Sequence, residues 1–186
     1  MANFYPKAIF NNSLRGILLL LFFSLPLVGF KPAAQENEVD YKIHAKFIYH
    51  FTKYIHWPTS AAKDIVSIGV LGNDVVYSEL QTITPGKKVG TLGFKIDKLT
   101  TESNFGAYNL IFVSSSQMKQ FDKVLTATAG KPILIITEKT GYARKGGDIN
   151  FYIDNDRLRF EINEKNITSK GMNIATDLLV LGTIVK

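Results

Sequence analysis

Three unbroken apolar segments most constrain the fold of this chain. They are IVSIGVLG (65–72), YNLIFVS (108–114) and PILIITE (132–138), each of which has the length of a strand. Because polar residues do not alternate with the apolar ones, both faces of each strand must be covered. Helical patterns lie between them, around Val75–Ile83 and Gln117–Ala127. This order predicts an α/β domain with a mainly parallel sheet between layers of helices.

A helix is predicted before the first strand, over Tyr41–Trp57, with Pro58 ending it. Its apolar residues recur at the spacing of one helical face, and they are Ile43, Phe47, Phe51, Tyr54 and Ile55. Lys42, Lys46 and Lys53 fall largely off this face, so we expect them to meet solvent. The pattern resembles a membrane-surface helix, but in a globular chain it indicates packing against a sheet.

The carboxyl-terminal part alternates apolar and polar residues, which is typical of strands with one solvated face. DINFYID (148–154) and RLRFEIN (157–163), joined by Asn155-Asp156, predict a β-hairpin. A further strand is expected at 88–97, and a final amphipathic helix at about 174–185. The whole pattern predicts one α/β domain: a mixed, mainly parallel sheet between helix layers, with a carboxyl-terminal β-hairpin and terminal helix.

The first 34 residues have the pattern of a secretory signal peptide. Lys7 and Arg15 precede the apolar run GILLLLFFSLPLVGF (16–30), and a cleavage point follows at Ala34. The run is shorter than the ~20 residues of a membrane span, although an uncleaved signal anchor stays an alternative. We therefore expect residues 35–186 to form a single exported domain.

The absence of cysteine removes several classes of function. An exported chain without cysteine has no disulfide framework, no thiolate metal site and no thiol catalysis. Without residues 1–34, which hold three basic residues and no acidic one, the net charge falls from +6 to +3. The remaining charges are scattered along the chain, so nucleic acid is not an expected partner.

All three histidines, His44, His50 and His56, lie in the first predicted helix. Their spacing of six residues places them about 120° apart around the helix axis, whereas metal-binding pairs on a helix use i,i+3 or i,i+4 spacing. We therefore predict no metal site and no cofactor. His44 and His50 are expected to cap or flank the packed face.

Three short motifs that suggest chemistry are better explained as turns and caps. Gly69–Asp74 lacks the glycine pattern of a nucleotide-binding loop, and Asn73 or Asp74 suits the cap of the next helix. Ser114–Ser116 lacks a nucleophile motif. Asp154–Asp156 lacks the glycine and glutamate of a calcium loop. Because no acid, base and nucleophile come together, we expect no catalytic residues and no enzyme.

With these segments in order, the chain resembles the YfiR-like family of exported domains, named after a periplasmic repressor. AKFIYHFTKYIHWP (45–58) is similar to the opening signature of the family, whose usual form is close to A-x-F-I-Y-N-F-A-K-Y-V-E-W-P. SIGVLGND (67–74), GGDINFYIDNDRLRFEIN (146–163) and LLVLGTIVK (178–186) continue the resemblance. It spans nearly the whole of residues 35–186.

The resemblance implies a periplasmic signalling domain. Such a domain binds the periplasmic part of an inner-membrane receptor, for example a diguanylate cyclase of cyclic-di-GMP signalling, and holds it inactive. The chain departs from the family pattern at His50 and His56, where Asn and Glu are usual. Members such as the namesake use cysteines as redox-sensitive bridges, so a chain without cysteine is denied a redox role. Whether this member represses or activates its partner stays open.

The candidate site for a receptor protein is the exposed face of the first helix and the corner that follows it. Its residues are Lys46, His50, Lys53 and Trp57. A second copy of the chain, in a homodimer, is a further partner that the sequence leaves open.

The rival hypothesis is a periplasmic small-molecule binding protein for an anion or a nucleotide-like ligand. Its candidate site is a loop in which glycine amides and cations suit a phosphate or carboxylate. The residues are Arg144, Lys145, Gly146 and Gly147, with Arg159 on the hairpin that follows. A glycine-rich turn leading into the hairpin explains the same loop without a ligand.

Overall fold

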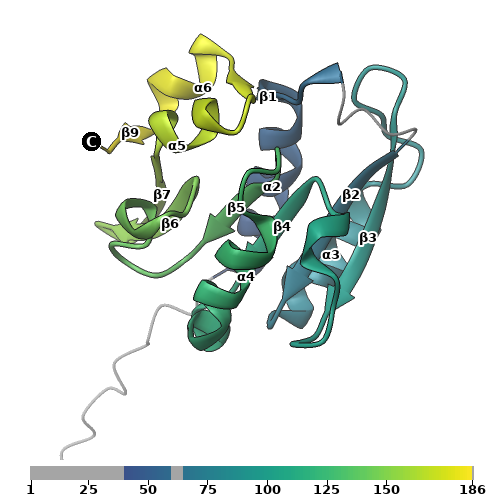
Figure 1. The fold of residues 1–186 in the computed structure, drawn as a ribbon, viewed down its shortest axis with the longest axis horizontal. Helices are drawn as coiled ribbons and strands as arrows, with labels where there is room; N and C mark the ends of the chain where they lie inside the picture. The colour runs from purple at the N-terminus through teal and green to yellow at the C-terminus, as the bar shows by residue number, and fades with distance from the viewer. Residues whose placement is uncertain (1–39, 60–64, 186) are drawn as a thin grey trace, which may run out of the picture. The chain divides into compact units, whose positions relative to one another are not determined.

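The computed structural model describes residues 40–59 and 65–185, so the predicted signal peptide and its cleavage point lie outside the described residues. Within these residues, seven strands form one sheet in the order β3-β2-β4-β5-β6-β7-β9, as Figure 1 shows. These strands are β2 (Ile65–Leu71), β3 (Gly93–Leu99), β4 (Leu110–Val113), β5 (Leu134–Thr137), β6 (Ile149–Asp154), β7 (Arg157–Ile162) and β9 (Thr183–Ile184). A second, two-stranded sheet pairs β1 (Ile55–His56) with β8 (Asn173–Ile174).

The main sheet is mixed and mainly parallel, which confirms the predicted fold class. Strands β2 to β6 pair in parallel, β7 is antiparallel to β6, and β9 is parallel to β7. The hairpin has the register that alternation predicts, because Phe151 pairs with Phe160 and Ile153 with Leu158. Asn155 and Asp156 adopt positive φ angles of 47° and 58° at its turn. Two such residues give the turn whose twist matches the strands.

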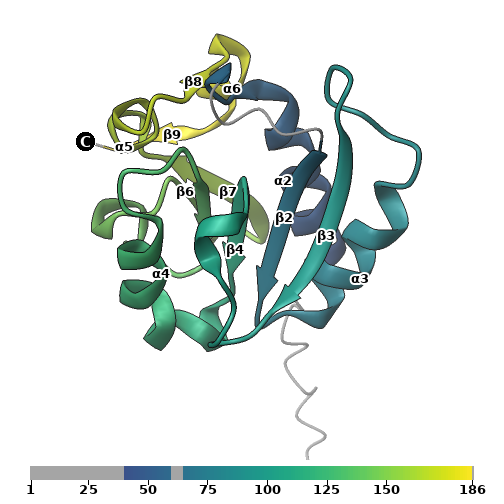
Figure 2. The same ribbon diagram turned by 45° about the vertical axis from the view of Figure 1, so that its right-hand side comes forward.

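Helices cover both faces of the sheet, and Figure 2 shows α4 on the opposite side from α2 and α3. Helix α2 comprises Tyr41–Tyr54, α3 Asp74–Ile83 and α4 Phe121–Thr128. Alternate residues of β4 enter two separate apolar clusters: Leu110 and Phe112 pack on the side of α2 and α3, and Ile111 and Val113 on the side of α4. This double burial explains why the central strands are continuously apolar.

Helix α2 is shorter than predicted, and its buried face is rotated. It ends at Tyr54 rather than Trp57, because Ile55–His56 is extended and pairs with β8. The predicted core residue Ile43 is 39 % exposed, whereas His44, expected only to flank the packed face, is 2 % exposed. The expectation for His44 was wrong, since the hairpin packs over the first turns of α2 and places Phe151 against its imidazole.

The predicted terminal helix is also wrong as a single element. Helix α6 comprises only Thr176–Leu181, and β8 and β9 flank it. Gly182 is extended and lies so close to β7 that an added Cβ would come within 2.6 Å of Phe160. This approach is what lets the chain join the sheet as β9. Helix α5 (Glu164–Ser169), capped by Asn163, was not predicted.

Smaller differences concern where elements begin. Strand β3 starts at Gly93 rather than Lys88, because Val89 and Leu92 bond to each other in a tight turn. The helix predicted at 117–127 starts as the 3-10 helix η3 (Ser115–Gln120) and continues as α4. Two other 3-10 helices are η2 (Phe105–Ala107) and η4 (Ala143–Lys145).

Candidate functional site

A half-open pocket of about 340 Å³ lies where β4 and β5 end. Ser115 begins η3 after β4, Glu138 directly follows β5, and Tyr41 and His44 come from the first turns of α2. Strand β6 pairs with only the last residues of β5 and continues past it, so Phe151 and Tyr152 form a wall. We call these six residues the carboxyl-edge pocket. In open α/β sheets, ligands bind outside the carboxyl ends of parallel strands.

The carboxylate of Glu138 is the main polar group of this pocket. Its side chain is 6 % exposed, and its Oε1 accepts a hydrogen bond from the backbone N–H of Ser115 at 2.8 Å. Its Oε2 lies 3.6 Å from His44 Nε2. Burial raises the pKa of Glu138, and the Ser115 bonds partly oppose this rise. Among the described residues, His44 is its sole ion-pair partner.

The imidazole of His44 does not supply a positive charge to this carboxylate at neutral pH. It packs between the rings of Tyr41 and Phe151, with centroid distances of 5.1 and 4.7 Å. Burial lowers the pKa of His44 to about 4, so the ring is neutral near pH 7. Its Nδ1 is buried and finds no hydrogen-bond partner within residues 40–59 and 65–185. The pocket therefore holds a carboxyl group without a fixed cation.

The pocket brings a serine, a histidine and a glutamate together, but not as a nucleophile relay. Ser115 bonds Glu138 through its backbone N–H, and no hydrogen bond within the described chain joins its hydroxyl to His44. A relay needs the histidine to face the nucleophile as well as the acid. In the same residues, no cluster of three or more His, Cys, Asp or Glu side chains is arranged to hold a metal ion.

The residues predicted to contact a receptor do not all lie on one surface. Lys46, His50 and Lys53 are exposed along α2, and none of the three forms an ion pair with a described residue. Lys53 Nζ lies 4.7 Å from the centre of the Tyr49 ring, and Lys87 Nζ lies 4.8 Å from it. We call Lys42, Lys46, His50 and Lys53 the basic face of α2.

Trp57 lies apart from this face and serves a structural contact. It is half-buried, packs against the apolar cluster beneath α2, and donates from Nε1 to the backbone oxygen of Asn109 at 3.2 Å. Asn109 precedes β4, so Trp57 lies near the end of the sheet opposite the carboxyl-edge pocket.

The residues predicted to hold an anion are close to a carboxylate. Arg144 lies 3.6 Å from Glu161 Oε1, and Asn150 donates to the other oxygen of Glu161 at 3.3 Å. Lys145 lies over the ring of Tyr142. Arg159 is exposed on β7, on the same strand as Glu161. Arg144 therefore already has a carboxylate partner, whereas Arg159 lies two residues from this carboxylate along β7.

The glycines of this loop have structural reasons for being glycine. Gly146 has a φ of 111° and ends η4. Gly147 donates to the oxygen of Tyr142, and an added Cβ would come within 2.9 Å of that oxygen. Close backbone approach of this kind accounts for both glycines.

Side chains fill the point where the strand order reverses, between β2 and β4. The hydroxyls of Ser114 and Ser116 both donate to the oxygen of Gly72, at 3.0 and 3.2 Å. Asn73 caps α3 by accepting from the N–H of Val76, as the sequence indicated. The carboxyl-edge pocket lies at the same edge of the sheet but next to this point, between β4 and the hairpin.

Sequence reasoning missed the carboxyl-edge pocket. The available signal was Glu138, a charged residue directly after the apolar run of β5. Its partners come from α2 and from the loop after β4, and no local spacing relates these three segments.

The fold and its site define a class: an α/β domain with a helix-covered, mainly parallel sheet and a pocket at its carboxyl edge. A sequence profile of the YfiR/HmsC-like family matches residues 41–183, so the chain belongs to this family. The family is periplasmic and regulatory rather than catalytic, and its members act with a partner protein. No curated protein matches the chain.

Among the solved structures that are similar to this chain, two share its fold at low sequence identity. One is the ABC domain in complex with L-Trp from Streptococcus pneumoniae, 13 % identical with a TM-score of 0.51 over 78 % of this chain. The other is a conserved domain protein from Vibrio cholerae O1 biovar eltor, 12 % identical with a TM-score of 0.53 over 79 %. The chain spans 60 % of the length of each.

No helix within residues 40–59 and 65–185 is long and apolar enough to cross a membrane.

Proposed function

We propose that this protein is an exported regulator that binds the periplasmic part of an inner-membrane receptor, such as a diguanylate cyclase, through the basic face of α2. In this proposal residues 1–34 are removed as a signal peptide and residues 35–186 act in the periplasm. The proposal adds a kind of partner and a surface to the regulatory role of the family.

The observation that carries the proposal is the basic face of α2 itself. Its lysines form no ion pair within the described chain, although other exposed lysines do, such as Lys95 with Asp97 and Lys98 with Asp74. A row of unpaired cations on a rigid helix complements an acidic surface, and such complementarity sets association rate and specificity.

A binding domain of this kind controls a receptor by preferring one of its two states. If the receptor alternates between an active and an inactive form, the regulator shifts it toward the form that it binds more tightly. A preference of about 1.4 kcal/mol changes the ratio of the two forms about tenfold. No chemistry by the regulator is required.

The test has two stages. Crosslinked pull-down of the full-length tagged protein from the membranes of its host should recover a membrane receptor with a cyclase or kinase output domain. Binding of that receptor's periplasmic part to the double variant Lys46→Glu, Lys53→Glu is then expected to weaken by about tenfold or more, because two attractive contacts become repulsive.

The matched control reverses two charges elsewhere on the molecule. Lys119 on η3 and Lys165 on α5 are also exposed and form no ion pair with a described residue, and Lys119→Glu with Lys165→Glu should leave affinity nearly unchanged. Equal affinity of both folded variants would remove the basic face of α2 as the contact surface. Recovery of nothing but the protein itself would point to self-association instead of a receptor.

A further inference from the structure

We propose that the carboxyl-edge pocket binds the ammonium group of a small primary amine with an apolar body, and that Glu138 is its counter-ion. This inference concerns a pocket that takes Tyr41 and His44 from the first turns of α2 and includes none of the residues of its basic face. It does not depend on the proposed receptor.

The first argument is the electrostatic state of the pocket. The side chain of Glu138 is 6 % exposed and is hydrogen-bonded by the neutral residue Ser115, and no lysine or arginine among the described residues forms an ion pair with it. Buried carboxylates normally have a paired cation, because desolvation of an unpaired charge is costly. His44 does not fill this role near neutral pH, since burial lowers its pKa to about 4. An ammonium group would supply the charge that the fold leaves out.

The second argument is the sign of the surrounding groups. The residues that line this pocket in the described chain include no Lys and no Arg. Lys139 follows Glu138 in the sequence, but its Nζ lies 5.9 Å from the ring centre of Tyr142. Apart from Glu138 and His44, the titratable residues in its lining are Tyr41 and Tyr152, and the hydroxyl of Tyr152 lies 3.1 Å from that of Thr183. An anionic ligand would therefore meet Glu138 without a compensating cation.

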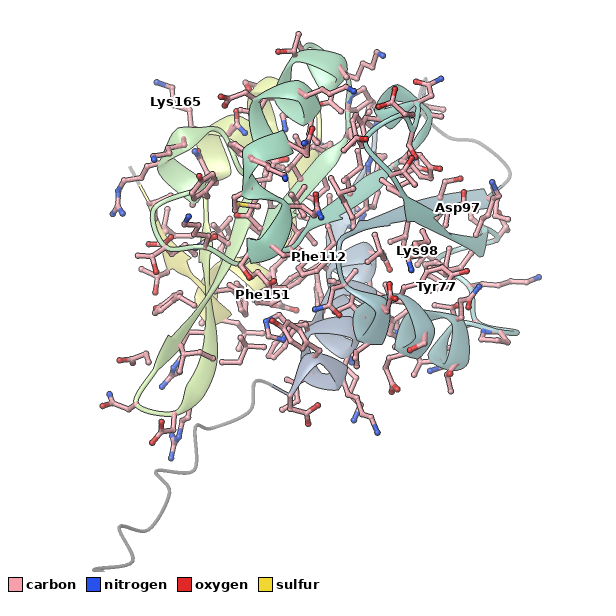
Figure 3. All side chains as sticks on the ribbon, turned by 90° about the horizontal axis from the view of Figure 1, so that it is seen from below. Tyr77, Asp97, Lys98, Phe112, Phe151 and Lys165 are labelled. Atoms are coloured by element: carbon pink, nitrogen blue, oxygen red, sulfur yellow. The ribbon has the colours of Figure 1, made fainter. Side chains whose placement is uncertain are left out.

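The third argument is the shape and composition of the walls. Phe151, labelled in Figure 3, and Tyr41 line the cavity, and their rings pack on either side of His44 beside the carboxylate. Aromatic faces attract cations and also pack against an apolar body. A volume of about 340 Å³ is at the small end of ligand sites, so the pocket suits a compact molecule.

The experiment uses three probes of similar size and different charge: phenethylamine, 2-phenylethanol and 3-phenylpropionate. Each is titrated by nuclear magnetic resonance into the protein purified after export, with the backbone amides of Ser115 and Thr140 as reporters of the pocket. We expect saturable shifts with the amine, at least about tenfold weaker binding of the alcohol, and no binding of the acid.

Glu138→Gln keeps the shape of the side chain and removes its charge. Affinity for phenethylamine should fall about tenfold or more, as expected for loss of one charge-assisted contact. The control is Glu161→Gln, which alters a half-buried carboxylate that is already beside Arg144. It should leave amine binding unchanged.

Dependence on pH supplies a readout that needs no variant. Amine binding requires ionised Glu138, so affinity should rise with pH through the raised pKa of this carboxyl, whereas alcohol binding should not. Absence of amine binding, equal affinity for amine and alcohol, preference for the acid, or unchanged binding in Glu138→Gln would each overturn the proposal.

Discussion

Asp148 and Glu138 are two buried carboxylates at opposite ends of neighbouring strands, and they have very different partners. Asp148 precedes β6, is 0 % exposed, and accepts from Lys170 Nζ at 2.7 Å, Ile135 N–H at 2.6 Å and Asn166 Nδ2 at 2.7 Å. Glu138 follows β5, is hydrogen-bonded by Ser115, and has a neutral imidazole at 3.6 Å in place of a cation. The fold supplies a cation to Asp148, and among the described residues it supplies none to Glu138.

The difference separates a structural group from a binding group. The partners of Asp148 come from β5, α5 and the residue after α5, so this one carboxylate ties the carboxyl-terminal elements to the sheet. Glu138 joins few elements and faces a cavity. A buried ionisable group in a cleft with incomplete partners is a better candidate for a site than one in a closed network.

The largest expected effect comes from breaking the closed network. Lys170→Met removes the cation and leaves Asp148 buried without its charge partner, which should lower the free energy of unfolding by about 3–5 kcal/mol. Urea unfolding measures the loss. Lys165→Met alters an exposed lysine of the neighbouring helix α5 and should cost less than about 0.5 kcal/mol. Similar losses in the two variants would refute a structural role for the Asp148 network.

A smaller effect should appear on acidification, through His44. Its folded pKa of about 4 lies below the ordinary value of 6.5, so the unfolded state binds the proton first. The contribution of His44 to stability is therefore present above 6.5 and lost as the pH falls toward 4. Between about pH 7 and pH 4, His44→Gln should lose about 3 kcal/mol less than the unaltered protein.

Glu138 acts in the opposite direction over this range, because a raised carboxyl pKa favours the folded state as the pH falls. The comparison with His44→Gln isolates the histidine, since Glu138 is present in both proteins. His56→Gln, at an exposed position, is the control and should follow the unaltered protein. Coincident pH curves for all three would show that His44 is not neutral in the fold.

The smallest effect is expected for Glu138 itself. Glu138→Gln retains an acceptor for the Ser115 N–H and removes a buried charge that has no cation, so the free energy of unfolding should change by less than about 1 kcal/mol near neutral pH. Thermal or urea unfolding checks this. A loss as large as that of Lys170→Met would mean that Glu138 is structural like Asp148, and the contrast between them would disappear.

Much of the fold was predictable because its signals are local. Continuous apolar runs predicted β2, β4 and β5, and alternation with a two-residue turn predicted the register of β6 and β7. What failed were elements whose ends depend on distant partners. Ile55–His56 continues the helical pattern but pairs with β8, and Gly182 leaves the helix because it packs against β7.

The candidate sites divide in the same way. The exposure of Lys46 and Lys53 followed from the period of the first helix and is seen in the structure. The proximity of Arg144 to Glu161, and the anchoring of Trp57 on Asn109, had no local signal. Both contacts join residues on different elements.

The sequence by itself determined the central strands β2, β4 and β5, the hairpin, the solvent-facing lysines of α2 and the family, because these depend on periodicity and on motifs within short windows. The tertiary structure alone decided which ionisable groups lack partners. Glu138, His44 and Ser115 meet because parallel strands end at one edge, where the hairpin closes over α2. Burial there raises the pKa of Glu138 and lowers that of His44, and burial is a property of the packed chain rather than of any segment.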